Sequence, residues 1–456
     1  MTPNLLASLN RYRRLMDGKG DACGNGTAMP SYADVFRSRG YLVIFLAAAL
    51  STWGDYLARV AVAAFVLEHT GSPFAAAATF AVSLIPSIFG RSLLAPIADR
   101  IPYKYVLIAS HLLRATLVSI LILVVSTIPP ADTALGPGSN GDENSILWML
   151  FGLLFLIELA GGPAVPSNQI LMTDLFSDRR LYARAVGLGN LSEQVNQAIG
   201  LALGGLVVAS VGVVRGLWFD LATFLVSALV ITLVVKVRKV RGTPSAGIVG
   251  FFHDIGEGAT YLFRHPVLMS LLALSLCSVW AIAAPEAVAL AYAAEKDPSG
   301  SVSLGGLLMA APICGAVVGL LIVGRWQPES QNSRIIVMAP LMPVPLVATV
   351  FAPPVPITWL LWFACGVLQA FMLPLQSTFS LVVPVEMRGR VFGLGGALSV
   401  AASGVAFLVA GYLAEQTSPA RAVAYCAGIS LVAIFALAFR WPRTALSRAV
   451  DTAYNS

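Results

Sequence analysis

The chain has 456 residues, of which 57% are apolar and only 11% are charged, and its mean hydropathy is +0.80. Soluble globular proteins carry about 25% charged residues, so this chain cannot cover a water-facing surface and its main solvent must be lipid. The net charge of +6 is explained by topology, as shown below, and indicates no nucleic-acid partner.

Long apolar runs follow one another along the chain after the N-terminal tail. A helix that spans a membrane needs roughly 20 apolar residues, and only helices satisfy their own backbone groups without closing into a barrel. The runs lack the alternation of barrel strands. We therefore predict an all-α membrane protein with twelve transmembrane helices. They cover residues 40–67, 73–98, 104–128, 146–173, 184–211, 216–236, 267–293, 303–324, 334–352, 357–383, 390–413 and 421–440.

The distribution of Lys and Arg predicts the orientation, because these residues are enriched in cytoplasmic loops. Twelve spans place both termini on one side of the membrane. That side carries 23 of the 29 Lys and Arg residues, the opposite loops carry three, and three lie within spans. Both termini are therefore predicted to face the cytoplasm, in a multi-pass protein of the cell (inner or plasma) membrane.

An internal repeat divides the chain into two similar halves. The stretch "RAVGLG" begins at Arg184, "RVFGLG" begins at Arg390, and their offset of 206 residues persists downstream. Two related bundles can rock around a shared site at mid-membrane, as secondary transporters do. We predict a cytoplasmic tail (1–39), a six-helix bundle (40–236), a cytoplasmic linker (237–266), a second six-helix bundle (267–440) and a C-terminal tail (441–456).

Several short motifs resemble those of the major facilitator superfamily. The turn "APIADRIPYKY" at 95–105 looks like the signature between the second and third helices of that family. "GDYLARVAVAAFVLEHTGS" from Gly54, "EGATYLFRHPVL" from Glu257 and "VPVEMRGRVFGL" from Val383 resemble the branch that contains siderophore exporters and macrolide efflux proteins. The resemblance implies the major facilitator fold, with two pseudo-symmetric six-helix bundles.

The same resemblance implies a cytoplasmic gate of charged residues. Asp99, Arg100 and Lys104 occupy the charged positions of the signature turn. Such pairs can hold two bundles together in one state and release them in another. Arg184 and Arg390, paired with Asp174 and Glu386, are candidates for the same role. The alternative is that these Arg residues only anchor the topology.

Charged residues inside the predicted spans are the main candidates for proton coupling. Ionisable groups in a membrane are costly, and they usually face a cavity, a partner or a proton path. Asp55 and Arg59 lie one turn apart on the first span, Arg114 lies on the third and Glu158 on the fourth. We expect Asp55 and Glu158 to carry the proton, opposed by Arg59 or Arg114. The alternative is a buried Asp55–Arg59 pair that only fixes helix packing.

Other polar residues within the spans are candidates for a substrate cavity. They are Glu286, Glu193, Asn168, Gln169, Gln369 and Gln376. Proline residues next to the four amides can bend the helices, and the carbonyls freed by a bend are tolerated where they line a cavity. For each amide, helix packing is the alternative.

The motifs exclude several other classes. No phosphate-binding "GxxxxGK[ST]" occurs, the four His residues form no metal-spaced pair, and no nucleophile motif is found, so we expect neither an enzyme nor a metal site. Gly200, Gly204 and Gly205 have the spacing of the antiporter motif of major facilitator exporters. The sequence thus predicts a monomeric, proton-coupled exporter of an amphipathic small molecule, with the proton gradient as its energy source and no cofactor. Nutrient uptake is the alternative, and a channel or receptor is a second one.

Overall fold

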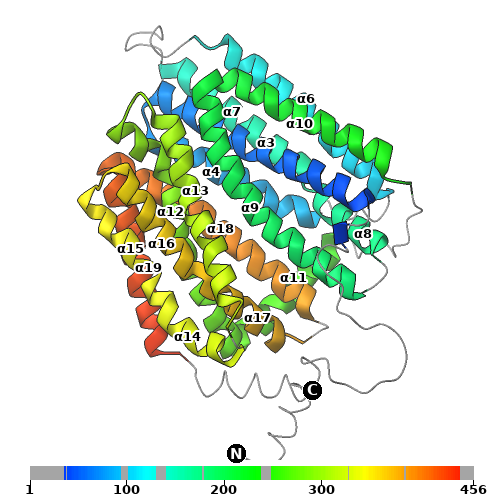
Figure 1. Cartoon of the computed structure of the whole chain (residues 1–456), viewed down its shortest axis with the longest axis vertical. Helices are drawn as coiled ribbons and strands as arrows, with labels where there is room; N and C mark the ends of the chain where they lie inside the picture. Colours follow the sequence, from blue (N-terminus) through cyan, green and yellow to red (C-terminus); the bar gives the residue numbers. More distant parts are fainter. Residues whose placement is uncertain are drawn as a thin grey trace, which may run out of the picture.

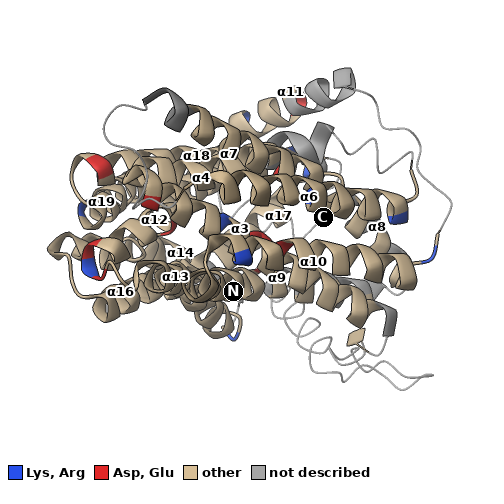
Figure 2. Ribbon diagram, turned by 90° about the horizontal axis from the view of Figure 1, so that it is seen from above, with Lys and Arg blue, Asp and Glu red and all other residues tan. Residues whose placement is uncertain are grey.

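The computed structural model describes residues 35–36, 39–93, 101–129, 140–176, 179–237, 248–326, 328–384 and 387–441. Every regular element within these ranges is an α-helix or a 3-10 helix. Figure 2 shows that most of this helical body carries neither acidic nor basic residues. An all-helical, lipid-solvated chain is what the composition predicts.

The helices of the first half pack around α3. They are α3 (Arg39–Thr70), α4 (Pro73–Leu93), α6 (Tyr103–Thr127), α7 (Asn140–Gly161), α8 (Ala164–Leu175), α9 (Arg179–Val211) and α10 (Val213–Val234). α3 contacts α4, α9 and α10, and α6 contacts α7 and α10. These contacts bury the middle of α3, including Val60, Ala61 and Val62.

The helices of the second half pack around α12. They are α11 (Ile248–Arg264), α12 (Pro266–Lys296), α13 (Ser301–Val323), α14 (Pro328–Leu341), α15 (Val344–Val347), η2 (Ala348–Phe351), α16 (Val355–Leu368), η3 (Gln369–Phe371), α17 (Met372–Val382), α18 (Arg388–Gln416) and α19 (Pro419–Phe439). α12 contacts α13, α18 and α19. In Figure 1 this half, coloured yellow-green to red, lies beside the blue-to-green first half.

Nine helices in the described ranges are long and apolar enough to cross a membrane. Three further apolar segments, at Pro73–Pro86, Ser145–Gly161 and Ile335–Phe351, are shorter. Together these twelve segments follow the order of the twelve predicted spans.

Proline accounts for the places where a predicted span is broken. The fourth span stops at Gly161 and resumes as α8 after Pro163, and the ninth is interrupted before Pro343. The tenth passes through the 3-10 turn η3 just ahead of Pro374. Proline has no N–H to donate and crowds the carbonyl four residues earlier, so each break lies next to its cause.

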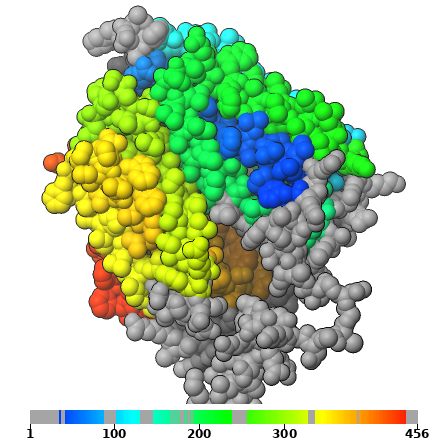
Figure 3. Space-filling model, in the orientation of Figure 1, coloured from blue at the N-terminus to red at the C-terminus, as the bar shows by residue number. Residues whose placement is uncertain are grey.

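Two helix pairs make most of the contacts between the halves: α4 with α18, and α9 with α13. In addition, α12 contacts α3 and α4. Figure 3 shows the surfaces of the two halves meeting on one face of the molecule. The contacts between the halves lie near one end of the body. This end carries the loops at 71–72, 212, 297–300 and 417–418. We call it the short-loop end, and the opposite end, which carries α11 (Figure 1), the α11 end.

The α4–α18 contact recurs once per helical turn of α18. At the short-loop end, the Glu415 carboxylate accepts hydrogen bonds from the Ser72 hydroxyl and from the backbone N–H of Phe74, the latter at 3.3 Å. Ser72 also accepts from the N–H of Ala75 at 3.1 Å, so it caps α4. One turn earlier on α18, Gly411 lies against Ala77 and Phe74. One turn earlier again, Phe407 of α18 contacts Phe80 of α4, with ring centroids 6.0 Å apart.

The α9–α13 contact brings two backbones together at Gly205 and Gly306. A Cβ atom on Gly205 would lie 2.8 Å from the Cα of Gly306 and 2.6 Å from the carbonyl oxygen of Val302. A Cβ on Gly306 would meet the carbonyl of Leu201 at 2.6 Å. Small residues permit such close approach of membrane helices, so glycine is required on both sides of this contact.

The glycine contact makes a prediction about stability. Gly205→Ala should lower the free energy of unfolding by about 1–3 kcal/mol, because the added methyl group overpacks the contact. Gly428→Ala on α19 is the control, since no atom lies within 4 Å of its added Cβ. Thermal unfolding of the purified protein in detergent measures both. Equal melting temperatures for the two variants would contradict the tight contact.

Candidate functional site

Two ion pairs cross between helices in the interior of the first half. The Arg114 Nη2 atom of α6 lies 2.6 Å from Oδ1 of Asp55 on α3. The Arg59 guanidinium of α3 donates to Oε1 of Glu158 on α7, from Nη2 at 2.6 Å and from Nε at 3.0 Å. The spacing of Asp55 and Arg59, one turn apart, presents both to neighbouring helices. The Asp55–Arg59 pair considered from the sequence is thus replaced by two pairs that each join different helices.

Further contacts hold Arg114 in place. Its Nε donates to the carbonyl of Ile157 on α7 at 3.2 Å, and its guanidinium carbon lies 4.3 Å from the centroid of the Phe224 ring on α10. A guanidinium over an aromatic face is attracted by the ring quadrupole. Arg114 therefore links α3, α6, α7 and α10.

Asp220 on α10 is a member of this cluster that the sequence analysis missed. It is 1% exposed, and its Oδ1 atom has no hydrogen-bond partner. That atom faces α3 so closely that a Cβ on Gly54 would lie 2.5 Å away. Asp220 also interacts electrostatically with Asp55 and Arg114. The signal that would have found it is simple: it is the only charged residue between Arg215 and Lys236.

A second set of polar side chains surrounds Tyr56 on α3. Arg59 and three carboxylates, Glu158, Glu193 and Glu286, all interact electrostatically with Tyr56. Arg59 also interacts with Glu286, which lies on α12 in the other half. Nearby, the Trp53 indole donates to the amide oxygen of Asn196 at 3.0 Å. Of the predicted cavity residues, Glu286 and Glu193 therefore lie near the ion pairs.

The predicted amides are spread over other elements. Asn168 is exposed on α8, Gln369 is half-buried in η3 and Gln376 is exposed on α17. Gln169 belongs to α8, but its side chain lies outside the described residues. Gln376 lines a cavity of about 380 Å³ between α12, α17 and α18. This cavity lies wholly within the second half and does not include the ion pairs.

The predicted cytoplasmic gate is described only in part. Asp99, Arg100 and Glu386 lie outside the described residues, as do the side chains of Arg184 and Asp174. Lys104 donates to the carbonyl of Thr232 on α10 at 2.7 Å, within its own half. Arg390 forms an ion pair with Glu257 of α11. Each of these two contacts thus joins elements of the same half.

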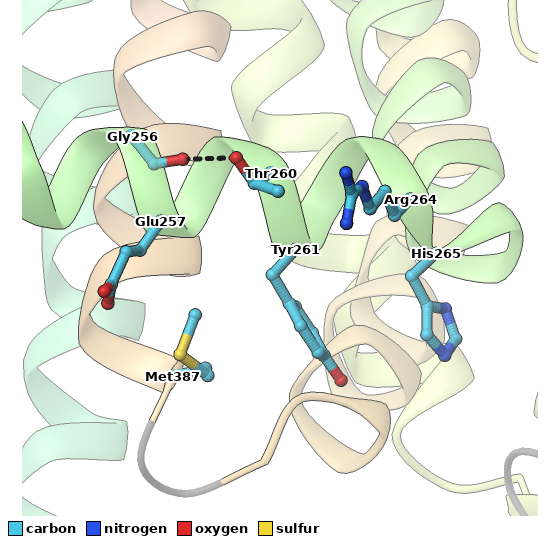
Figure 4. A pocket seen from close by; sticks show the side chains of 7 residues that line it. All are labelled: Gly256, Glu257, Thr260, Tyr261, Arg264, His265 and Met387. Carbon is cyan, nitrogen blue, oxygen red and sulfur yellow. Dashed lines mark hydrogen bonds between the residues drawn. The ribbon is translucent and has the colours of Figure 1, made fainter.

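Figure 4 shows the pocket of about 700 Å³ beside this α11 contact. Glu257 and Tyr261 come from one side of α11, His265 follows the end of that helix, and Met387 approaches from the turn before α18. Tyr261 stacks on His265 with centroids 6.0 Å apart, and burial raises the pKa of the Tyr261 phenol. The pocket lies at the α11 end, away from the intramembrane charges. Among the residues described, no group of three His, Cys, Asp or Glu could hold a metal ion.

The two kinds of ion pair should differ in their effect on stability. Arg114→Met leaves Asp55 buried without its partner, which costs about 3–5 kcal/mol in a typical buried pair. Arg390→Met breaks a pair whose side chains are 35% and 45% exposed, and such pairs contribute about 0–1 kcal/mol. Adding Asp55→Leu to Arg114→Met should restore much of the loss. The free energies of unfolding of the wild type, the two Arg variants and the double variant, measured in detergent solution, check this order. Equal losses of stability in Arg114→Met and Arg390→Met would contradict it.

Comparison with known proteins identifies the family to which the chain belongs. The family model of the Major Facilitator Superfamily matches residues 44–380. The chain is 24% identical over 393 residues to the multidrug efflux pump Tap of Mycolicibacterium fortuitum, covering 83% of this chain and 90% of that protein. It is 25% identical over 389 residues to the Mycobacterium tuberculosis pump of the same name, covering 83% and 88%.

Solved structures show the same fold. The nucleoside transporter NupG superposes with a TM-score of 0.63 at 14% identity, covering 88% of this chain and 99% of that one. A bacterial homologue of the iron transporter ferroportin, in an inward-facing state, superposes with a TM-score of 0.60 at 16% identity, covering 90% and 98%. With its apolar helices and the family match, the chain belongs to the Major Facilitator Superfamily and is a multi-pass membrane transporter, not an enzyme.

Proposed function

We propose that the protein exports an amphipathic small molecule across the cell membrane in exchange for protons, by alternating access. The observation that carries this proposal is the cluster of two interhelical ion pairs, Asp55–Arg114 and Arg59–Glu158, inside a transporter bundle. Replacing buried ion pairs by apolar residues often leaves a protein as stable or more stable. Their presence in a membrane span therefore supports a functional role.

Partial exposure of the two acids supports proton binding at the ion pairs. The side chains of Asp55 and Glu158 are 22% and 17% exposed, so the surrounding helices do not enclose them completely. A proton that binds Asp55 neutralises the carboxylate that accepts from Arg114. The guanidinium then lacks a charged partner, and an unpaired charge in a membrane bundle is costly. Protonation thereby favours a different arrangement of α3 and α6.

The contacts between the halves support the alternating-access part of the proposal. The bundles meet at the short-loop end through Glu415, Gly411 and the Gly205–Gly306 contact. If Lys and Arg mark the cytoplasmic loops, this end faces outward and both termini face the cytoplasm. The structure then corresponds to a state closed toward the outside. Opening would require Glu415 to leave Ser72 and the N-terminus of α4.

Two observations favour export over uptake. The two curated relatives described above are named multidrug efflux pumps. Gly200 and Gly204 of α9 lie against Trp53, Tyr56 and Leu57 of α3, and the next residue, Gly205, forms the glycine contact with α13. This glycine run, which has the spacing of the antiporter motif, thus packs α9 closely against both α3 and the other half.

Proton coupling is tested in liposomes that contain the purified protein. We expect ethidium flux driven by an imposed pH gradient, and loss of at least about tenfold of the driven rate in Asp55→Asn and in Glu158→Gln. A neutral amide can no longer carry the proton. Glu68→Gln is the matched control, because Glu68 is exposed near the end of α3, outside the cluster. Flux that ignores the gradient would reject proton antiport, and accumulation in the opposite direction would favour uptake.

The outward gate is tested by cross-linking. In a background without native cysteines, Ser72→Cys and Glu415→Cys place one thiol on each side of this contact. The cysteine at 415 is shorter than glutamate, so a short bifunctional methanethiosulfonate reagent is used to join the two thiols. Cross-linking should lower ethidium transport by about tenfold or more, because the halves can no longer separate at this end, and dithiothreitol should restore it. Ser72→Cys alone is the control. Full transport by the cross-linked double variant would show that this contact does not open during the cycle.

A further inference from the structure

The second half contains a cavity whose chemistry differs from that of the ion-pair cluster. About 380 Å³ in volume, it lies between the start of α12, α17 and the start of α18. This volume falls within the range of small-molecule sites, at its lower end. None of the described residues that line it is charged. A ligand group placed there meets no counter-charge.

The lining favours a flat, uncharged ring. The Phe379 and Phe392 rings belong to it, with centroids 5.7 Å apart and planes inclined at 32°. Aromatic side chains bind ring systems through stacked or edge-on contacts. Transferring a charged group into such surroundings without a partner would cost far more than these contacts return.

A small number of polar groups complete the cavity. Gln376 supplies an amide, and Ser275 and Ser380 supply hydroxyl groups. Amides and hydroxyls both donate and accept hydrogen bonds. They therefore suit a ligand with one or a few hydroxyl or carbonyl groups on an otherwise apolar ring body.

Glycine residues on α18 provide the space. A Cβ on Gly396 would find no atom within 4 Å, and a Cβ on Gly395 would meet only a methyl carbon of Leu272, at 3.8 Å. Both glycines line the cavity. The volume thus depends on missing side chains, and it can be filled by substitution without displacing the backbone.

We propose that this cavity binds the uncharged, ring-bearing body of a transported molecule, so that neutral amphipathic ring compounds are among the substrates. This inference rests on the proposed transport function. The proton is bound at Asp55 and Glu158 in the first half, and the ring body is bound in the second. Substrate and proton then do not compete for the same side chain, and they influence each other only through the relative position of the halves.

Equilibrium binding to the purified protein in detergent, without a pH gradient, tests the cavity. The probes are two uncharged ring compounds, chloramphenicol and hydrocortisone, and the cation ethidium. We expect the wild type to bind at least one neutral probe, and Gly396→Leu to raise its Kd by about tenfold or more, because the leucine occupies the cavity. Gly396→Ala should have a smaller effect. Gly428→Leu is the control, since it also has open space but lies on α19, outside the cavity.

Phe379→Leu gives a second route if Gly396→Leu fails to fold. It removes a stacking ring and keeps an apolar side chain, so it should also weaken binding of the neutral probe. Neutral-probe binding that is unchanged in every folded cavity variant, or a wild type that binds only ethidium, would overturn the proposal. Because this assay needs no gradient, its result is separate from that of the liposome experiment. Flux that ignores the gradient, with cavity-dependent binding intact, would reject proton antiport and leave the cavity standing.

Discussion

A charged side chain inside a lipid-embedded bundle is costly unless a neighbouring helix supplies a partner or the side chain faces a cavity. Asp55 and Arg59 satisfy this condition through Arg114 and Glu158, each on a different helix. The ion pairs therefore fix how α3, α6 and α7 lie against one another, and they make that arrangement sensitive to any event that removes a charge. One interaction can thus both stabilise a conformation and respond to a change in the charge of either partner.

The two halves repeat one architecture but differ in their chemistry. The first half encloses Asp55, Arg59, Arg114, Glu158 and Asp220, whereas the cavity of the second half is lined only by uncharged residues. A shared fold thus supports two different kinds of binding environment. Because the halves touch mainly along two helix pairs, a change in one can reach the other through a small rigid-body displacement.

Hydropathy and proline predicted most of the fold, because lipid forces each apolar run into a helix and proline interrupts it. The candidate site was harder to predict from the sequence than the fold. The sequence indicated the two acids Asp55 and Glu158 and an opposing Arg59 or Arg114. Spacing along one helix says nothing about the rotation of its neighbours, so which Arg pairs with which acid could not be assigned. Asp220 was overlooked within an apolar run. The role of Glu415 depends on α4, 341 residues earlier in the chain, and no local pattern reports such a contact.

The Gly205–Gly306 contact has a mechanical consequence. Two backbones meet there with no Cβ atom on either glycine, so the two halves are smooth at this point. A smooth contact can open and close without separating interlocked side chains. The motion that opens this end would then need little energy at the two glycines, and most of its energetic control would reside in the charges some distance away.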